Sequence, residues 1–229
     1  MLADSLTNVT TEMLRSEAFQ STSPHLKVAL FLGAMAFLSS ALVTMTAFTR
    51  IVIVLSFVRR ALSTQEIPPT QVILGLSLFL TLFVMGPTLT TLEQEAVTPY
   101  LQESISGEVA WTRGSGILSQ FMLSQTRKQD LLLMMDLADV RSIESPEDVP
   151  LRVLVPSFVI SELKTAFIMG FCIYLPFVLI DLVVSVILMA LGMMMMPPVV
   201  ISTPCKLLLF ILIDGWSLIV RSLSLSFQT

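Results

Sequence analysis

Four long runs of apolar residues set the pattern of this sequence. They occupy residues 28–49, 67–92, 165–192 and roughly 199–220, and a charge interrupts only the last two. Each run approaches the ~20 residues that span the hydrocarbon core of a bilayer and is far longer than a strand. The pattern therefore predicts an all-α protein of long helical hairpins, whose helices read as four apolar membrane-type segments.

The first two runs are not simple membrane spans. After Arg50 the first run resumes, so one helix over 26–62 would be about 55 Å long, well beyond the ~30 Å of the hydrocarbon core. Either this helix breaks near Arg50 or much of it lies outside lipid. In the second helix, over 67–92, Pro87 follows Gly86 and should kink or end the helix.

Two polar regions lie outside these apolar runs, one before the first run and one between the second and the third. Residues 1–25 form a polar N-terminal segment without the basic start and apolar centre of a signal peptide. Residues 93–160 carry ten acids and five Lys or Arg residues, and we expect two short amphipathic helices there. Arg59 and Arg60 lie between the first two runs, which places that loop in the cytoplasm and the acidic region outside it.

The second hairpin comprises helices over 161–192 and 199–225 and a loop over 193–198. The loop reads Met193, Met194, Met195, Met196, Pro197 and Pro198. Methionine is apolar and deformable, and it reseals after being displaced. The loop is therefore either apolar filler at a packed hairpin tip or a surface that closes against something variable.

Charges lie within or beside the apolar helices, where each costs at least about 2.5–3.5 kcal/mol without a partner. They are predicted to be buried or intersubunit charges: Arg50, Glu162, Lys164, Asp181, Lys206 and Asp214. The balance of signs favours ion pairs between neighbouring helices or subunits over an ion pathway. Lys206 and Asp214 are spaced about 80° apart around a helix, so we expect them to share one broad face.

The amino-acid composition limits the classes of function that the chain can have. Of 229 residues 54% are hydrophobic and 13% charged, the net charge is −4, and a nucleic-acid partner would need a basic surface instead. His25 is the single histidine, and Cys172 and Cys205 lie in apolar runs as inert packing groups. We predict no catalytic residues, no metal site and no cofactor, and therefore no enzyme.

Several stretches resemble one family. They are Thr46–Ser56 with Arg60–Leu62 and Ile67–Pro69, then Phe121–Leu131, Val155–Pro156, Ser161–Phe167, Pro176–Val183, Leu188–Pro198 and Lys206–Trp216. In order and spacing they resemble the FliP family of the flagellar export gate, whose injectisome relative is SctR. The resemblance covers residues 28–223, so we expect a single FliP-like domain over 1–229. Ser63 departs from it, because the family pattern there is Arg-Asn-Ala-Leu-Gly.

The resemblance implies a function. It implies a non-enzymatic channel subunit of the flagellar type III export gate, in the bacterial inner membrane and flagellar basal body. A pentamer would join FliR-like and FliQ-like subunits and a FlhB-like protein in a helical cone that contacts membrane lipid and conducts unfolded substrates. Met193–Met196 would be its pore gasket. The alternatives are an ion-coupled transporter using Asp181 and Lys206, or a scaffold whose methionines only pack.

Overall fold

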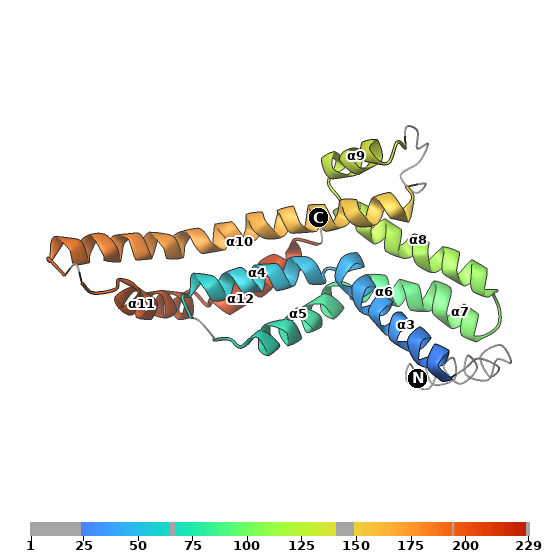
Figure 1. The fold of residues 1–229 in the computed structure, drawn as a ribbon, viewed down its shortest axis with the longest axis horizontal. Coiled ribbons are helices and arrows are strands. Elements are labelled where there is room, and N and C mark those ends of the chain that lie inside the picture. The colour runs from blue at the N-terminus through green and yellow to red at the C-terminus, as the bar shows by residue number, and fades with distance from the viewer. Residues whose placement is uncertain (1–23, 65–66, 141–148, 194, 228–229) are drawn as a thin grey trace.

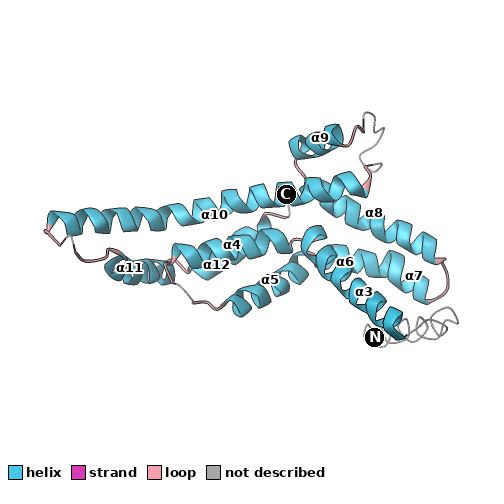
Figure 2. Ribbon diagram, viewed as in Figure 1, coloured by secondary structure: helices cyan, strands magenta, loops and turns pink. Residues whose placement is uncertain are grey.

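The computed structural model describes residues 24–64, 67–140, 149–193 and 195–227, and this part of the chain is helical without a strand (Figure 2). The all-α prediction is confirmed. Most of the N-terminal polar segment, residues 1–23, lies outside the described residues, as does Met194. The helices are α3 (Pro24–Met45), α4 (Phe48–Ala61), α5 (Thr70–Val84), α6 (Gly86–Leu92), the π-helix η1 (Glu93–Val97), α7 (Thr98–Leu101), α8 (Gly107–Gln125), α9 (Lys128–Leu137), α10 (Leu151–Ala190), α11 (Val199–Leu212) and α12 (Gly215–Leu225).

The molecule is elongated along α10, which runs through most of its length (Figure 1). Helices α4 and α11 lie along one part of α10, and α12 contacts α11 and α5, whereas α3 and α6–α8 diverge at the N-terminal end of α10. At 40 residues α10 is about 60 Å long, and it begins at Leu151, ten residues before the predicted start of the second hairpin. The last turns of the predicted acidic region, 93–160, thus belong to the hairpin.

The predicted first helix divides into α3 and α4 at Thr46 and Ala47. Hydroxyl groups around the break bond to carbonyls in the last two turns of α3: Thr44 donates to Ser40 over 2.8 Å, and Thr49 donates to Val43 over 2.6 Å. Such side-chain bonds to the backbone compete with the helical ladder and favour a bend. The predicted overlong helix is therefore two helices, with the break at Thr46 and Ala47, just before Arg50.

The second predicted helix is also divided, and the expectation for Pro87 is confirmed. Helix α5 ends at Val84 and α6 begins at Gly86 with Pro87 in its first turn, where a missing N–H is tolerated. The axes of Thr70–Val84 and Gly86–Leu101 differ by 60°. The two amphipathic helices expected in the acidic region are α8 and α9, and they meet at Thr126 and Arg127.

The core forms where α4 packs against α10 and α5. Ile51, Val54, Leu55 and Val58 of α4 are at most 1% exposed. Gly170 of α10 permits the close approach, because a Cβ there would lie 2.5 Å from the ring of Phe57. A second cluster, of Met122, Val149, Val153, Leu154 and Phe158, joins α8 and α9 to the start of α10.

Much of the remaining apolar surface is exposed. Within the described residues, Val28–Met45 and Leu151–Ala190 are long and apolar enough to cross a membrane, and each bent pair counted as one span raises the number to four. Cys172 and Cys205 are exposed on this surface. Their predicted burial was wrong for the single chain, because the apolar runs around them turn outward.

Candidate functional site

The methionine loop lies at the tip of the second hairpin, at the far end of α10 (Figure 1). Gly192, at a φ of +76°, ends the helix in a Schellman motif: Met193 N–H bonds to the Leu188 carbonyl and Gly192 N–H to that of Met189, both over 3.0 Å. Pro198 then precedes α11. Glycine and proline thus stop one helix and start the next, which confines the methionines to a short turn.

The described methionines of the loop are exposed. Met193 is 42% exposed, Met196 is 38% exposed and Met195 is 99% exposed, whereas Met194 lies outside the described residues. A side chain that is almost completely exposed does not fill space within its own chain. The interpretation as filler at a packed tip therefore fails for Met195 in the isolated chain.

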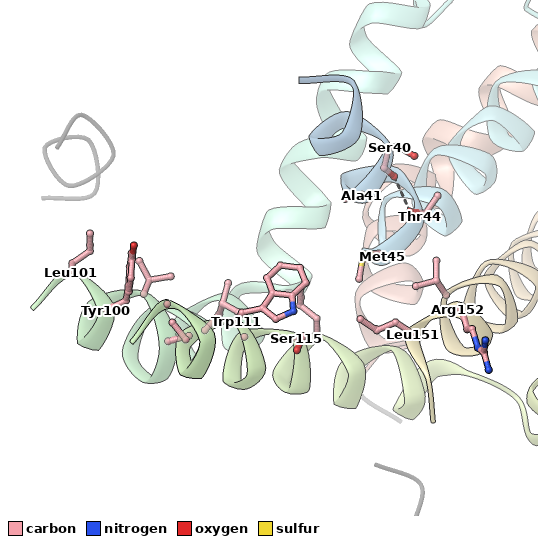
Figure 3. A pocket seen from close by; sticks show the side chains of 18 of the residues that line it. Ser40, Ala41, Thr44, Met45, Tyr100, Leu101, Trp111, Ser115, Leu151 and Arg152 are labelled. Carbon is pink, nitrogen blue, oxygen red and sulfur yellow. Dashed lines mark hydrogen bonds between the residues drawn. The ribbon is translucent and has the colours of Figure 1, made fainter. Parts of the chain in front are cut away.

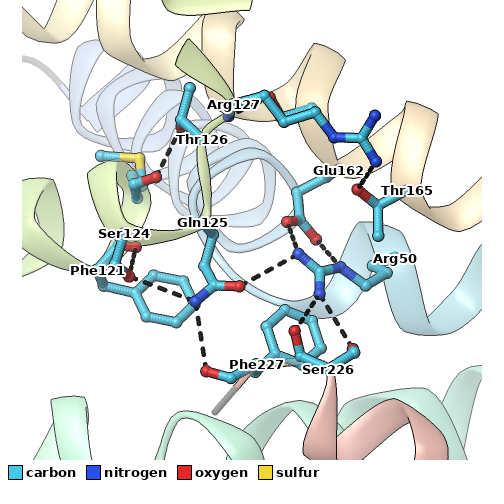
Figure 4. Close-up of polar contacts among 12 residues, drawn as sticks. Arg50, Phe121, Ser124, Gln125, Thr126, Arg127, Glu162, Thr165, Ser226 and Phe227 are labelled. Atoms are coloured by element: carbon cyan, nitrogen blue, oxygen red, sulfur yellow. Dashed lines mark hydrogen bonds and ion pairs between the residues drawn. The ribbon is translucent and has the colours of Figure 1, made fainter. Parts of the chain in front are cut away.

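Arg50 and Glu162 form an ion pair in the core, between α4 and α10 (Figure 4). The side chains are 3% and 0% exposed. Arg50 Nε donates to Glu162 Oε2 over 2.8 Å, and Nη2 donates to Oε1, so the pair is bidentate. This geometry gives the strongest charge-assisted contact available to a carboxylate. Both residues were predicted from the sequence as buried or intersubunit charges, but their pairing was not.

Arg50 also bonds to two other segments of the chain. Its Nη1 donates to the carbonyl and the hydroxyl of Ser226 over 2.9 and 3.0 Å, and Nη2 donates to Gln125 Oε1 over 3.3 Å. The guanidinium lies 3.8 Å from the centre of the Phe227 ring (Figure 4). One buried cation thus joins α4, α8, α10 and the residues after α12.

A neighbouring polar group holds α9 against α10. Ser161 Oγ donates to Asp130 Oδ2 over 2.7 Å and accepts from the backbone N–H of Arg127 over 2.9 Å. Lys164, which is exposed, lies 4.0 Å from Asp130. Asp130 is buried and was missed in sequence analysis, although its place before the apolar run of α9 marks it as a residue of the first turn.

A second ion pair, in which only the cation is buried, lies near the other end of α4. Lys206 on α11 is 1% exposed, and its Nζ donates to Asp181 Oδ2 on α10 over 2.5 Å and to Ser63 Oγ over 2.6 Å. Ser63 has a φ of 55°, the left-handed conformation that glycine adopts most readily. The departure from the family pattern therefore supplies a hydroxyl that bonds to the buried ammonium group.

Asp214 does not join this site. It is exposed at a φ of 51°, where α11 gives way to α12 and the axes differ by 64°. The expectation that Lys206 and Asp214 share one helix face was wrong, because the left-handed residue ends the helical period between them. Within the described residues, no three His, Cys, Asp or Glu side chains gather as a metal site would require.

Comparison with known proteins decides the family. A model described as the FliP family matches residues 31–223. The flagellar biosynthetic protein FliP of Pectobacterium carotovorum subsp. carotovorum is 54% identical over 210 residues, which is 92% of this chain and 81% of that protein. The chain belongs to the FliP family. The FliP proteins of Bacillus subtilis (strain 168) and Aquifex aeolicus (strain VF5) are 50% and 44% identical, over 91% and 89% of this chain and 94% and 86% of theirs.

Membership of the FliP family covers nearly all the elements of the site. The matched range includes α4, α10, α11 and the methionine loop, and stops before Ser226 and Phe227. The chain is thus a member of a family of flagellar biosynthetic proteins. Its described residues include helices that are long and apolar enough to cross a membrane.

Proposed function

We propose that this FliP-family chain is a non-enzymatic, channel-forming subunit of the flagellar type III export gate. Several copies, a pentamer by family resemblance, would assemble with FliR-like, FliQ-like and FlhB-like subunits in the bacterial inner membrane, at the flagellar basal body. Unfolded export substrates would pass through the centre of this assembly. The methionine loop of each copy would seal the channel when no substrate occupies it.

The observation that carries the proposal is the exposure of the loop at the tip of a long hairpin. Met195 is 99% exposed, and the hairpin is fixed at Asp181 and Lys206 behind the tip. Loops presented in this way by several copies would meet around a common axis. Flexible thioethers there would close on one another and yield to polypeptides of differing sequence.

Replacing Met193, Met194, Met195 and Met196 together by Ala tests the seal. Since the described methionines are exposed, we expect the oligomer to form normally, whereas cells or vesicles that contain it become leaky to small solutes. Met189→Ala, on the exposed surface of α10 outside the loop, is the matched control and should leave permeability unchanged. Unchanged permeability of the fourfold variant would refute the gasket and favour a scaffold.

The ion-coupled transporter makes the opposite prediction at Asp181. A transporter would lose coupling in Asp181→Asn but would keep its oligomer. In the export gate, the same change leaves Lys206 buried beside a neutral amide, and an unpaired buried charge weakens the folded hairpin and its assembly. Native mass spectrometry of the variant separates the two functions.

A further inference from the structure

An apolar groove opens between the end of α3 and the arm formed by η1, α7 and α8 (Figure 3). Its volume is about 980 Å³. Met45 lies on the α3 side, Trp111 and Tyr100 lie on the arm, and Leu151 and Arg152 of α10 lie at one end. The groove is large enough to receive the side chains of another helix.

The walls of the groove are held by specific contacts. Pro99 has no N–H to offer the Glu95 carbonyl, and Arg113 Nη1 on α8 donates to that carbonyl instead over 3.4 Å. Gly107 and Gly114 of α8 face this run of helices, and a Cβ at either position would lie 3.5 Å from the side chain of Tyr100 or Leu92, which is ordinary contact distance. The groove is thus a defined feature of the arm.

A matching apolar surface lies on α9. Leu132, Leu133 and Leu137 are 62%, 50% and 71% exposed, and they share one face of the helix with Asp136. Helix α9 belongs to neither a candidate span nor a bent pair. Contiguous exposed leucines mark an interaction surface, and the carboxylate of Asp136 on the same face favours a protein partner over lipid.

The groove and the α9 face lie on opposite sides of the start of α10. Leu151, Arg152 and Val155 of α10 line the groove, whereas Ser161 bonds to α9 from the other face of the helix. In Figure 1, α3 and α9 accordingly diverge on opposite sides of α10. One chain cannot bring these two surfaces together, but two copies can.

We propose that α9 of one copy docks into the groove of the next copy. The three leucines enter the apolar lining, and Asp136 meets Arg152 at the groove's end. Both charged residues are exposed, and within the described residues neither has an ion pair. Two different surfaces that repeat from copy to copy generate a ring or a helix. The inference rests on the proposed function, since it assigns a contact within that oligomer.

Charge reversal tests the contact. We expect Asp136→Arg and Arg152→Asp each to lower the oligomer fraction in native mass spectrometry by at least about tenfold, because each places like charges together. The double variant should recover most of the oligomer. Both residues are exposed, so circular dichroism should be unchanged, and Arg221→Asp on α12 is a matched control without effect. Absence of recovery in the double variant would overturn the Asp136–Arg152 contact.

Cross-linking between copies tests the docking directly. In a Cys172→Ser and Cys205→Ser background, one tagged copy carries Leu133→Cys and a differently tagged copy carries Trp111→Cys. A short bifunctional maleimide should join the two tagged copies, whereas the pair of Leu133→Cys and Ile211→Cys on α11 should give no joined product. No joined product from an intact oligomer overturns the docking and leaves the groove to another subunit or to lipid. A wild-type chain that stays monomeric overturns the proposed function itself.

Discussion

The buried pair of Arg50 and Glu162 gives the sharpest test of the fold. In Glu162→Gln the guanidinium keeps its place in the core but loses a carboxylate that accepts two of its hydrogen bonds. Removing one partner of a buried ion pair costs about 3–5 kcal/mol, which lowers the ratio of folded to unfolded protein by roughly two to four orders of magnitude. Arg50→Met should cost as much, because Glu162 is 0% exposed and would remain without its cation.

The double variant separates pairing from packing. Arg50→Met with Glu162→Gln leaves no buried charge, so we expect it to be more stable than either single variant. It should not reach the wild type, because Ser226 and Gln125 also lose the Arg50 donors. Arg60→Met, which removes an exposed cation from the same helix, is the control and should change stability by less than about 0.5 kcal/mol.

Denaturant titration of the purified chain, followed by circular dichroism at the helical minimum, measures these differences. The slope of the transition should stay constant across the set, since the surface exposed on unfolding does not change. A Glu162→Gln variant as stable as the Arg60→Met control would refute the reasoning. It would mean that solvent reaches the pair.

Substitutions at three further positions test local geometry. Gly170→Ala sets a methyl group 2.5 Å from the Phe57 ring, so the unfolding midpoint should fall by an amount equivalent to about 1–3 kcal/mol. Ser63→Ala should be less stable than Ser63→Gly in the same titration, because both lose the bond to Lys206 but only alanine keeps the strain at a φ of 55°. Asp214→Gly should keep or raise the melting temperature, whereas Asp214→Val should lower it, because the φ there is 51°.

The long helices could be predicted from the sequence, but their ends could not. The apolar runs predicted all-α structure because membrane-length runs have no other secondary structure, and Pro87 marked a real bend. The break at Thr46 and Ala47 was one of two alternatives and was placed only near Arg50, since it depends on hydroxyl groups that bond to nearby carbonyls. The start of α10 at Leu151 was missed because Arg152 and Pro156 interrupt its first turns, and a proline usually marks the boundary of a helix.

The candidate site was predicted residue by residue, but its pairing was not. Charges in apolar segments indicated Arg50, Glu162, Asp181 and Lys206 because such charges need partners. Which charge meets which depends on how α4 and α11 pack on α10, and no local pattern specifies this packing. Ser226, Gln125 and Ser63 escaped notice for the same reason, since neutral polar residues give no signal of burial.

The bond between Lys206 and Asp181 also sets the mechanics of the hairpin tip. Asp181 lies nine residues before Ala190, the last residue of α10, so about 14 Å of helix extends beyond this fixed point. A rotation of about 20° there would carry the end of that helix sideways by about 5 Å, comparable with one turn of helix. The ion pair thus lies about 14 Å behind the methionine loop. A small change in the helix angle at the pair would therefore move the methionines by several ångströms.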